Sequence, residues 1–123
     1  MTAYGWVVDV VYPGFGVIVV NGEEYDCDVV IERGRVRRRR KGPSRAQRSR
    51  FGHTPLSADE VIPWSAPRLV VGTGASGRLP LTPELLQEAA TRGVTVIALP
   101  TSAACELLRG ADDNTSAVLH VTC

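Results

Sequence analysis

Apolar residues and turn residues alternate along the first third of the chain in the pattern of antiparallel β-strands. Valine-rich runs occupy residues 7–11 and 15–20, and the Pro13-Gly14 pair separates them. β-Branched residues favour strands, whereas Pro-Gly pairs mark turns. Asn21-Gly22 predicts a type I′ hairpin turn, because both central residues of that turn need a positive φ. Residues 25–32 then alternate, which predicts a third strand with one buried and one wet face.

The second half of the chain has the order of an α/β unit. Leu69–Val71 and residues 94–100 are short apolar runs without polar alternation, as in strands that are covered on both faces. Residues 116–123 form a last predicted strand. Strands that alternate with helices indicate right-handed crossovers in one sheet. The N-terminal strands either extend that sheet or pack beside it.

Two amphipathic helices are predicted between these strands. The first has Thr82 as its N-cap and Pro83 at its first position, where the missing N–H is not needed. It ends at Gly93, and its buried stripe is expected to comprise Leu85, Leu86, Ala89 and Ala90. The second helix starts from an N-cap at Thr101 or Ser102 and ends near Gly110. Its expected inner residues are Leu107 and Leu108.

A shorter helical turn is predicted before the first buried strand. Ser57 and Glu60 have the spacing of a capping box, and Pro63 ends this turn. No internal repeat or linker divides the chain, so residues 1–123 are expected to form a single α/β domain.

Charge is distributed unevenly, although the whole chain has a net charge of only +1. Residues 33–50, called the basic segment below, contain nine arginines, one lysine and no acidic residue. The remainder holds four arginines against thirteen acidic residues, so the body of the protein is acidic. Because Val36 is its single residue of a buried type, the basic segment is expected to be a mobile loop or hairpin tip.

Three interpretations of the basic segment remain open. In the favoured one, its charges are solvated or lie against the acidic body; in the second, they bind an acidic protein partner. Nucleic acid is the third and least favoured, because aromatic residues that would stack on bases are not interleaved with the arginines. The candidate residues for a partner or polyanion are Arg37, Arg38, Arg39, Arg40, Lys41, Arg45, Arg48 and Arg50.

Residues 72–78, called the glycine turn below, contain the G-x-G-x-x-G spacing of a dinucleotide-binding loop. That loop must open directly into a helix, and an acidic residue must end the next strand. Here residues 78–81 precede the helix and the next strand ends Leu99-Pro100-Thr101, which excludes a dinucleotide site. A tight turn is favoured, and the alternative is a site for phosphate or a mononucleotide. The candidate anion-binding residues are Gly72, Thr73, Gly74, Ser76, Gly77 and Arg78.

Residues with catalytic or metal-binding chemistry are few. Three cysteines lie far apart without a C-x-x-C pair, which excludes a disulfide framework and a zinc site. His120 and Cys123 stand three apart on a strand and therefore face opposite sides. His53, the other histidine, lies beside the basic segment without a candidate partner. We expect no catalytic residue, no metal, no cofactor and no enzymatic activity.

The order of these signals resembles a small family. It is the domain of unknown function shared by the mitochondrial respiratory complex I assembly factor three and the adipogenesis-associated single-domain protein. The most specific motifs are Asn21-Gly22, Gly72-Thr73-Gly74 with Gly77, and the ending His-x-Thr-Cys. The resemblance implies a three-layer α/β fold with a mixed central sheet, crossover helices and an N-terminal antiparallel hairpin. It also implies action through protein partners and no assigned catalysis.

The basic segment departs from this family, whose members usually have a shorter connection there. The chain has no mitochondrial presequence, which favours a bacterial or archaeal member. It also lacks the ~20-residue apolar run of a membrane span and a signal peptide, which predicts a cytoplasmic protein.

Our leading hypothesis is a non-enzymatic interaction protein that engages an unidentified protein partner, and strand edges in the N-terminal meander are compatible with a homodimer. The alternative is a small-anion or nucleotide-binding protein that uses the glycine turn. Nucleic-acid binding through the basic segment ranks third.

Overall fold

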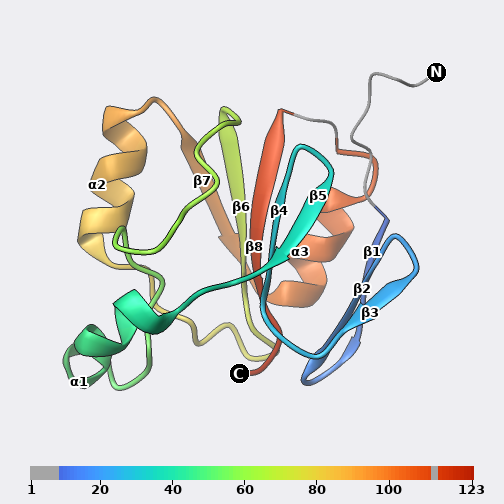
Figure 1. The fold of residues 1–123 in the computed structure, drawn as a ribbon, viewed down its shortest axis with the longest axis horizontal. Helices are drawn as coiled ribbons and strands as arrows, with labels where there is room; N and C mark the ends of the chain where they lie inside the picture. The colour runs from blue at the N-terminus through green and yellow to red at the C-terminus, as the bar shows by residue number, and fades with distance from the viewer. Residues whose placement is uncertain (1–8, 112–113) are drawn as a thin grey trace.

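Two β-sheets organise the part of the chain that this computed structural model describes, residues 9–111 and 114–123 (Figure 1). The smaller sheet is antiparallel, with the strand order β1-β2-β3. The larger sheet is mixed, with the order β5-β4-β8-β6-β7. The strands are β1 (Val10–Gly14), β2 (Val17–Val20), β3 (Glu23–Tyr25), β4 (Val29–Glu32), β5 (Arg35–Arg38), β6 (Arg68–Thr73), β7 (Thr95–Leu99) and β8 (Thr115–His120).

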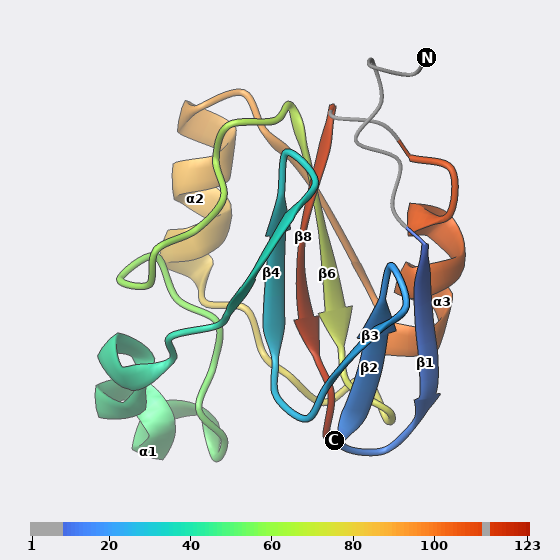
Figure 2. The same cartoon turned by 45° about the vertical axis from the view of Figure 1, so that its right-hand side comes forward.

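Parallel and antiparallel pairs meet at β8 in the larger sheet. Strand β6 pairs in parallel with β7 and β8, whereas β4 pairs antiparallel with β8 and β5. Helix α2 (Pro83–Thr91) joins β6 to β7, and α3 (Thr101–Leu108) joins β7 to β8. The two helices cover opposite faces of this sheet, and the smaller sheet lies on the α3 side (Figures 1 and 2). The three-layer α/β fold with a mixed sheet is therefore confirmed.

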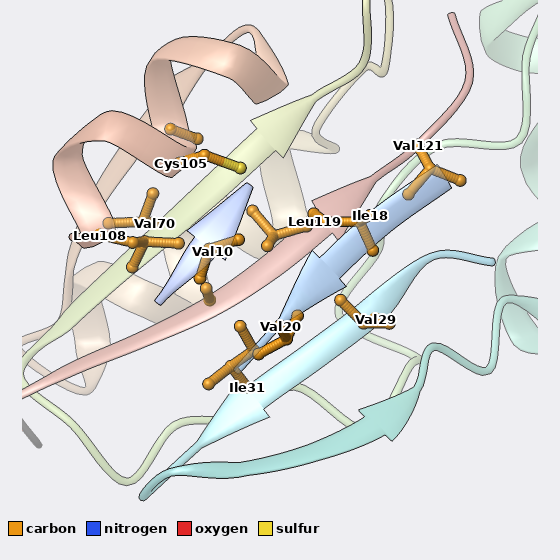
Figure 3. Packing of buried hydrophobic residues seen from close by; sticks show 12 residues of the cluster. Val10, Ile18, Val20, Val29, Ile31, Val70, Cys105, Leu108, Leu119 and Val121 are labelled. Atoms are coloured by element: carbon orange, nitrogen blue, oxygen red, sulfur yellow. The ribbon is translucent and has the colours of Figure 1, made fainter. Parts of the chain in front are cut away.

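Alternating side chains of the larger sheet supply both hydrophobic cores. On β4, Val30 packs on the α2 side, while Val29 and Ile31 pack on the side of α3 and the smaller sheet. Strands β6 and β8 alternate in the same way. Figure 3 shows the core on the α3 side, where Val20 of β2 lies beside Ile31 of β4 and Val10 of β1 lies near Leu108 of α3. Burial on both faces explains why β6 is a continuous apolar run in the sequence.

The hairpin that the sequence predicts at Asn21-Gly22 is confirmed. The φ angles of these residues are +52° and +83°, as a type I′ turn requires. The turn joins β2 to β3, which pair antiparallel. The first predicted strand includes residues 7 and 8, which lie outside the described residues, and β1 begins at Val10.

The prediction of one strand over residues 25–32 is wrong. The chain leaves the smaller sheet after Tyr25 and enters the larger sheet at Val29. Asp28 and Val30, which the alternation places on a wet face, are both buried. Val30 is buried because β4 is covered on both faces, and the Asp28 carboxylate points inward to polar partners.

Helix α2 begins and ends where the sequence predicts. The Thr82 hydroxyl accepts a hydrogen bond from the Leu85 N–H at 3.1 Å, and the helix ends two residues before Gly93. Its buried stripe is narrower than predicted, because Leu85 and Ala89 are buried but Leu86 and Ala90 are exposed. Among the described residues, no helix combines the length and the hydropathy that crossing a membrane requires.

Helix α3 begins without the predicted side-chain cap. Pro100 is the N-cap residue, and Thr101 is buried at the first helical position. The Thr101 hydroxyl donates to the carbonyl oxygen of His120 at 2.6 Å, so a tertiary contact takes the place of a cap. Leu108 is buried as predicted, whereas Leu107 is exposed.

The capping box predicted at Ser57 and Glu60 does not open a helix. Residues 58–60 form a turn, in which the Glu60 N–H donates to the Ser57 carbonyl oxygen at 3.3 Å. The Glu60 carboxylate bonds to Arg39 instead of returning to the backbone of Ser57. A buried ion pair has therefore replaced the local capping interaction.

Regular structure fills much of the basic segment, which the sequence led us to expect as a mobile loop or hairpin tip. Strand β5 pairs with β4 at one edge of the larger sheet, and Val36 lies opposite Ile31. A 3₁₀ helix, η2 (Gly42–Gln47), and a single helical turn, α1 (Arg48–Phe51), follow. The segment is therefore built onto the sheet through β5.

The glycine turn begins in the last two residues of β6 and packs closely against residues 122 and 123. Gly74 has a φ of +104°, and a Cβ at this residue would lie 2.4 Å from the carbonyl carbon of Cys123. The Ala75 N–H donates to the Thr122 carbonyl oxygen at 2.7 Å. The Arg78 N–H donates to the carbonyl oxygen of Cys123 at 3.0 Å. Both the backbone angle and the close approach therefore require glycine at position 74.

We expect Gly74→Ala to lower the free energy of unfolding by at least about 1–2 kcal/mol. The left-handed backbone costs an L-residue about that much, and displacement of the Cys123 backbone adds to it. Urea unfolding measures the loss as a lower midpoint at an unchanged slope. Gly42→Ala is the matched control, because a methyl group there meets no atom within 4 Å. Equal losses for the two variants would contradict this account.

Candidate functional site

Arg39, at the end of β5, is buried between two carboxylates. Its side chain is 1% exposed, and its Nη1 donates to Asp28 Oδ2 at 2.9 Å. Its Nε and Nη2 donate to the two carboxylate oxygens of Glu60 at 2.9 and 2.7 Å. Nη2 also donates to the carbonyl oxygen of Pro55 at 3.0 Å. Burial lowers the pKa of Arg39, but the bonds to Glu60 and Asp28 outweigh it, so the pKa is raised and the side chain stays charged.

A serine pair completes the polar contacts of Glu60. The Ser44 hydroxyl donates to Glu60 Oε2 at 2.5 Å, and the Ser44 and Ser57 hydroxyls lie 2.6 Å apart. Because Ser44 has a single hydroxyl proton and gives it to Glu60, Ser57 is the donor in the serine pair. Both serines are buried. The 3₁₀ helix of the basic segment is thereby tied to the loop before β6.

Asp28 joins the same cluster to the end of β8. Its Oδ2 lies 2.8 Å from Nδ1 of His120, and its Oδ1 accepts the Val121 N–H at 2.9 Å. Burial raises the pKa of Asp28, but the hydrogen bond and the charge of His120, the Val121 N–H and the Arg39 charge together lower it to about 2. Because this pKa is below the ordinary value, the stabilisation is present above about pH 4. It is lost as the pH falls toward 2.

A pocket of about 250 Å³, called the basic pocket below, opens beside this cluster. The basic segment contributes Arg39, Lys41 and Arg48 to its wall. Residues further along the chain complete it, namely His53, Thr54, Arg78, Leu79, His120, Thr122 and Cys123. Among the described residues, no aspartate or glutamate lines it. The fold thus brings both histidines of the chain and four of its basic side chains to one cavity.

The predicted anion site on the glycine turn contributes only Arg78 to this pocket. The N–H groups of the turn bond within the protein: that of Gly74 to the Thr101 hydroxyl at 2.8 Å and that of Gly77 to the Gly74 carbonyl oxygen at 3.2 Å. The N–H groups of Ala75 and Arg78 bond to residues 122 and 123. These four donors are therefore engaged, and Gly72, Thr73 and Ser76 do not line the pocket.

The basic residues predicted to bind a partner or polyanion lie in three different places in the structure. Arg39, Lys41 and Arg48 reach the basic pocket. A wider groove of about 630 Å³, called the arginine groove below, adjoins it and shares Arg39, Lys41 and Thr122. The remaining lining arginines of that groove are Arg37, Arg38, Arg40 and Arg45. Arg50 lies elsewhere, over the ring of Phe51 and 3.4 Å from Glu84.

Asp28, Glu60 and Thr122 are among the residues of the site that the sequence analysis missed. Asp28 and Glu60 are ordinary acidic residues in the sequence, and their partners lie far along the chain. Thr122 stands two residues after His120, and side chains two apart in an extended strand point to the same side. The sequence could therefore have indicated this pair. Sequence reasoning considered His120 with Cys123 instead and rejected that pair, because residues three apart on a strand face opposite sides.

Two further features of the described residues are their possible metal ligands and their cysteine thiols. The described residues hold no group of three His, Cys, Asp or Glu side chains placed to bind a metal ion. All three cysteines are free thiols. Burial raises the pKa of Cys105 to about 11, so that thiol stays protonated at neutral pH.

We expect Arg39→Met to lower the free energy of unfolding by about 3–5 kcal/mol, because Asp28 and Glu60 lose their shared buried cation. Arg38→Met is the matched control: Arg38 is exposed and adjacent, and its replacement should change stability by less than about 0.5 kcal/mol. Urea unfolding of both variants measures the difference. A loss for Arg39→Met as small as that for Arg38→Met would show that the buried cluster does not hold the basic segment.

Comparisons with known proteins agree with this architecture. A family model described as a protein of unknown function (DUF498/DUF598) matches residues 11–119. The conserved hypothetical protein PH1505 from Pyrococcus horikoshii OT3 is 32% identical, with a TM-score of 0.76 over 94% of this chain and 98% of that one. A search of the curated proteins finds no match.

Two more distant structures show the same fold. The protein MT938 is 22% identical, with a TM-score of 0.69 over 94% of this chain and 99% of that one. A Mth938-like domain protein from Bordetella pertussis is 21% identical, with a TM-score of 0.60 over 94% of this chain and 87% of that one. The resemblance to a domain of unknown function is confirmed, and this chain belongs to the family of proteins of unknown function DUF498/DUF598.

Proposed function

We propose that this protein binds a small anion in the basic pocket. One observation carries the proposal: Lys41, Arg48 and Arg78 line the pocket, and their side chains form no ion pair or hydrogen bond with the described residues. Arg39, in contrast, is fully paired. Three cations with uncommitted donors around one cavity form a site for phosphate or carboxylate.

The size of the pocket limits the ligand. About 250 Å³ is below the roughly 300–1,000 Å³ of sites for drug-sized ligands. The proposed ligand is therefore phosphate or a small phosphorylated or carboxylated molecule. This retains the anion alternative of the sequence analysis but changes its chemistry, because side chains replace the N–H groups of the glycine turn.

We expect inorganic phosphate to bind the protein at low ionic strength, and removal of one pocket cation to weaken binding about tenfold. A hydrogen bond to a charged group contributes about 1.5–3 kcal/mol, and 1.4 kcal/mol is a factor of ten in affinity. Isothermal titration calorimetry on Arg78→Gln and Lys41→Gln measures this loss. Arg35→Gln is the matched control, because Arg35 is exposed and lies outside the pocket.

Two results would count against the anion site. One is the absence of phosphate binding to the unmodified protein. The other is an equal loss of affinity in Arg35→Gln and Arg78→Gln, which would indicate attraction by net charge alone.

A second candidate function, docking of an acidic protein partner, follows from the arginine groove. Arg38, Arg40 and Arg45 are exposed along it, and β5 is an edge strand of the larger sheet. An edge strand presents unpaired backbone groups, and an extended acidic segment could pair with β5 while its carboxylates meet the arginines. This corresponds to the non-enzymatic interaction role expected from the sequence.

We expect a fluorescent, glutamate-rich peptide to bind the protein at moderate salt, as measured by fluorescence anisotropy. The double variant Arg38→Gln/Arg45→Gln should lose this binding, whereas Arg78→Gln should retain it. Single-stranded DNA of equal charge is the comparison ligand. Tighter binding of the DNA than of the peptide would favour a polyanion site and overturn the protein-partner candidate.

A further inference from the structure

Thr122, His120 and Asp28 form a continuous hydrogen-bonded chain in the wall of the basic pocket. The Thr122 hydroxyl lies 3.1 Å from Nε2 of His120, and Nδ1 of His120 lies 2.8 Å from Asp28 Oδ2. His120 and Thr122 both line the pocket, whereas Asp28 is a buried residue that lines the adjoining arginine groove instead. The imidazole therefore joins a hydroxyl of the basic pocket to a buried carboxylate.

The charge of Asp28 fixes which ring nitrogen of His120 holds the proton. The pKa of Asp28 is about 2, so this group is a carboxylate at neutral pH and can only accept hydrogen bonds. Nδ1 of His120 is therefore its donor. In the neutral imidazole Nε2 then has no proton, and it accepts the proton of the Thr122 hydroxyl.

Both ends of this chain are held in place by other contacts. Asp28 is oriented by Nη1 of Arg39 and by the Val121 N–H. The backbone of Thr122 is fixed by the Ala75 N–H of the glycine turn. A hydroxyl within reach of a base, and a base oriented by a third group, is the arrangement of an activated nucleophile.

The remaining side chains of the pocket suit an anionic ester. Arg78 and Lys41 line the same cavity as the Thr122 hydroxyl and can hold a negatively charged group of the substrate. They also bring positive charge to this cavity, and such charge stabilises a developing oxyanion. Cys123 lines the pocket as well, but the hydrogen-bonded partner of His120 Nε2 is Thr122.

We propose that Thr122 is a nucleophile and His120 its general base, in the hydrolysis of a small carboxylic ester with an anionic substituent. The proposal rests on the anion site proposed above, because the pocket cations would bind the substrate. It goes beyond binding in assigning a reaction to that site. Asp28 acts through His120 and is a positioning residue.

The reaction has two steps, acylation of Thr122 and hydrolysis of the acyl ester. In the first, Thr122 Oγ attacks the acyl carbon and its proton passes to Nε2 of His120. The carbon–oxygen bond to the leaving alcohol then breaks, and His120 returns the proton to that alcohol, which leaves an acyl ester on Thr122. In the second step, His120 takes a proton from water, which attacks the acyl carbon. The bond between the acyl carbon and Thr122 Oγ then breaks, the carboxylic acid departs, and His120 returns the proton to Thr122 Oγ.

The test compares the hydrolysis of two esters, neutral 4-nitrophenyl acetate and anionic 4-nitrophenyl hemisuccinate, by the full chain. We expect the protein to prefer the anionic ester and Thr122→Val to lower kcat/KM by at least about 100-fold, as for loss of an assisted nucleophile. Thr122→Ser should keep the activity, because it retains a hydroxyl. Thr95→Val, at an exposed position of β7, is the matched control and should match the unmodified protein.

Mass spectrometry after rapid quenching should locate one added acyl group on Thr122. An acyl group found on Lys41 or Cys123 instead would overturn the proposal, as would equal rates for the unmodified protein and Thr122→Val. Thermal unfolding verifies that Thr122→Val is folded, and the position of the acyl group on the unmodified protein tests the same hydroxyl if it is not.

Phosphate titration of the same variants separates the two proposals. If Thr122→Val and the unmodified protein bind phosphate equally but neither hydrolyses the esters, the anion site stands and the reaction is refuted. If Arg78→Gln loses phosphate binding and also the preference for the anionic ester, the reaction is supported and depends on the anion site.

Discussion

The buried Arg39 side chain is the interaction on which the arrangement of the site depends. A guanidinium removed from water is tolerated only where carboxylates and hydrogen bonds replace its hydration. Asp28 and Glu60 provide them, from the start of β4 and from the loop before β6. Because Arg39 belongs to the basic segment, this cluster fixes the start of η2 against the body. Lys41 and Arg48 are thereby brought to the same cavity as Arg78 and His120.

The glycine turn and the cluster around Arg39 each hold residues of the pocket wall in place. Gly74 allows residues 122 and 123 to pack against the turn, which positions the Thr122 side chain. Asp28 orients His120 from the interior. The glycines therefore serve the site indirectly: they shape the backbone that carries its side chains, and their N–H groups are engaged within the protein. The positive charge of the pocket comes from side chains of other segments.

Predictions from local patterns were correct where one short segment contains the whole interaction. Asn21-Gly22 forms its turn, and Thr82 caps α2, because both partners of each interaction are near neighbours. Predictions failed where a distant partner competed. Glu60 bonds to Arg39 instead of capping a helix, and the Thr101 hydroxyl bonds to His120 instead of capping α3. The single strand predicted over residues 25–32 failed for the same reason. Its two ends, β3 and β4, pair with distant strands in two different sheets.

The sequence alone determined the alternation of strands and helices, the hairpin, the family resemblance and the uneven charge. Each of these depends only on neighbouring residues, on short motifs or on composition. It supplied four residues of the candidate site, Arg39, Lys41, Arg48 and Arg78, but without the geometry that joins them. Only the tertiary structure placed Asp28 beside His120, which lies 92 residues further along the chain. The physical reason is that charge pairing and desolvation depend on distances in the folded protein. The order of residues in the sequence does not show which distant groups become neighbours.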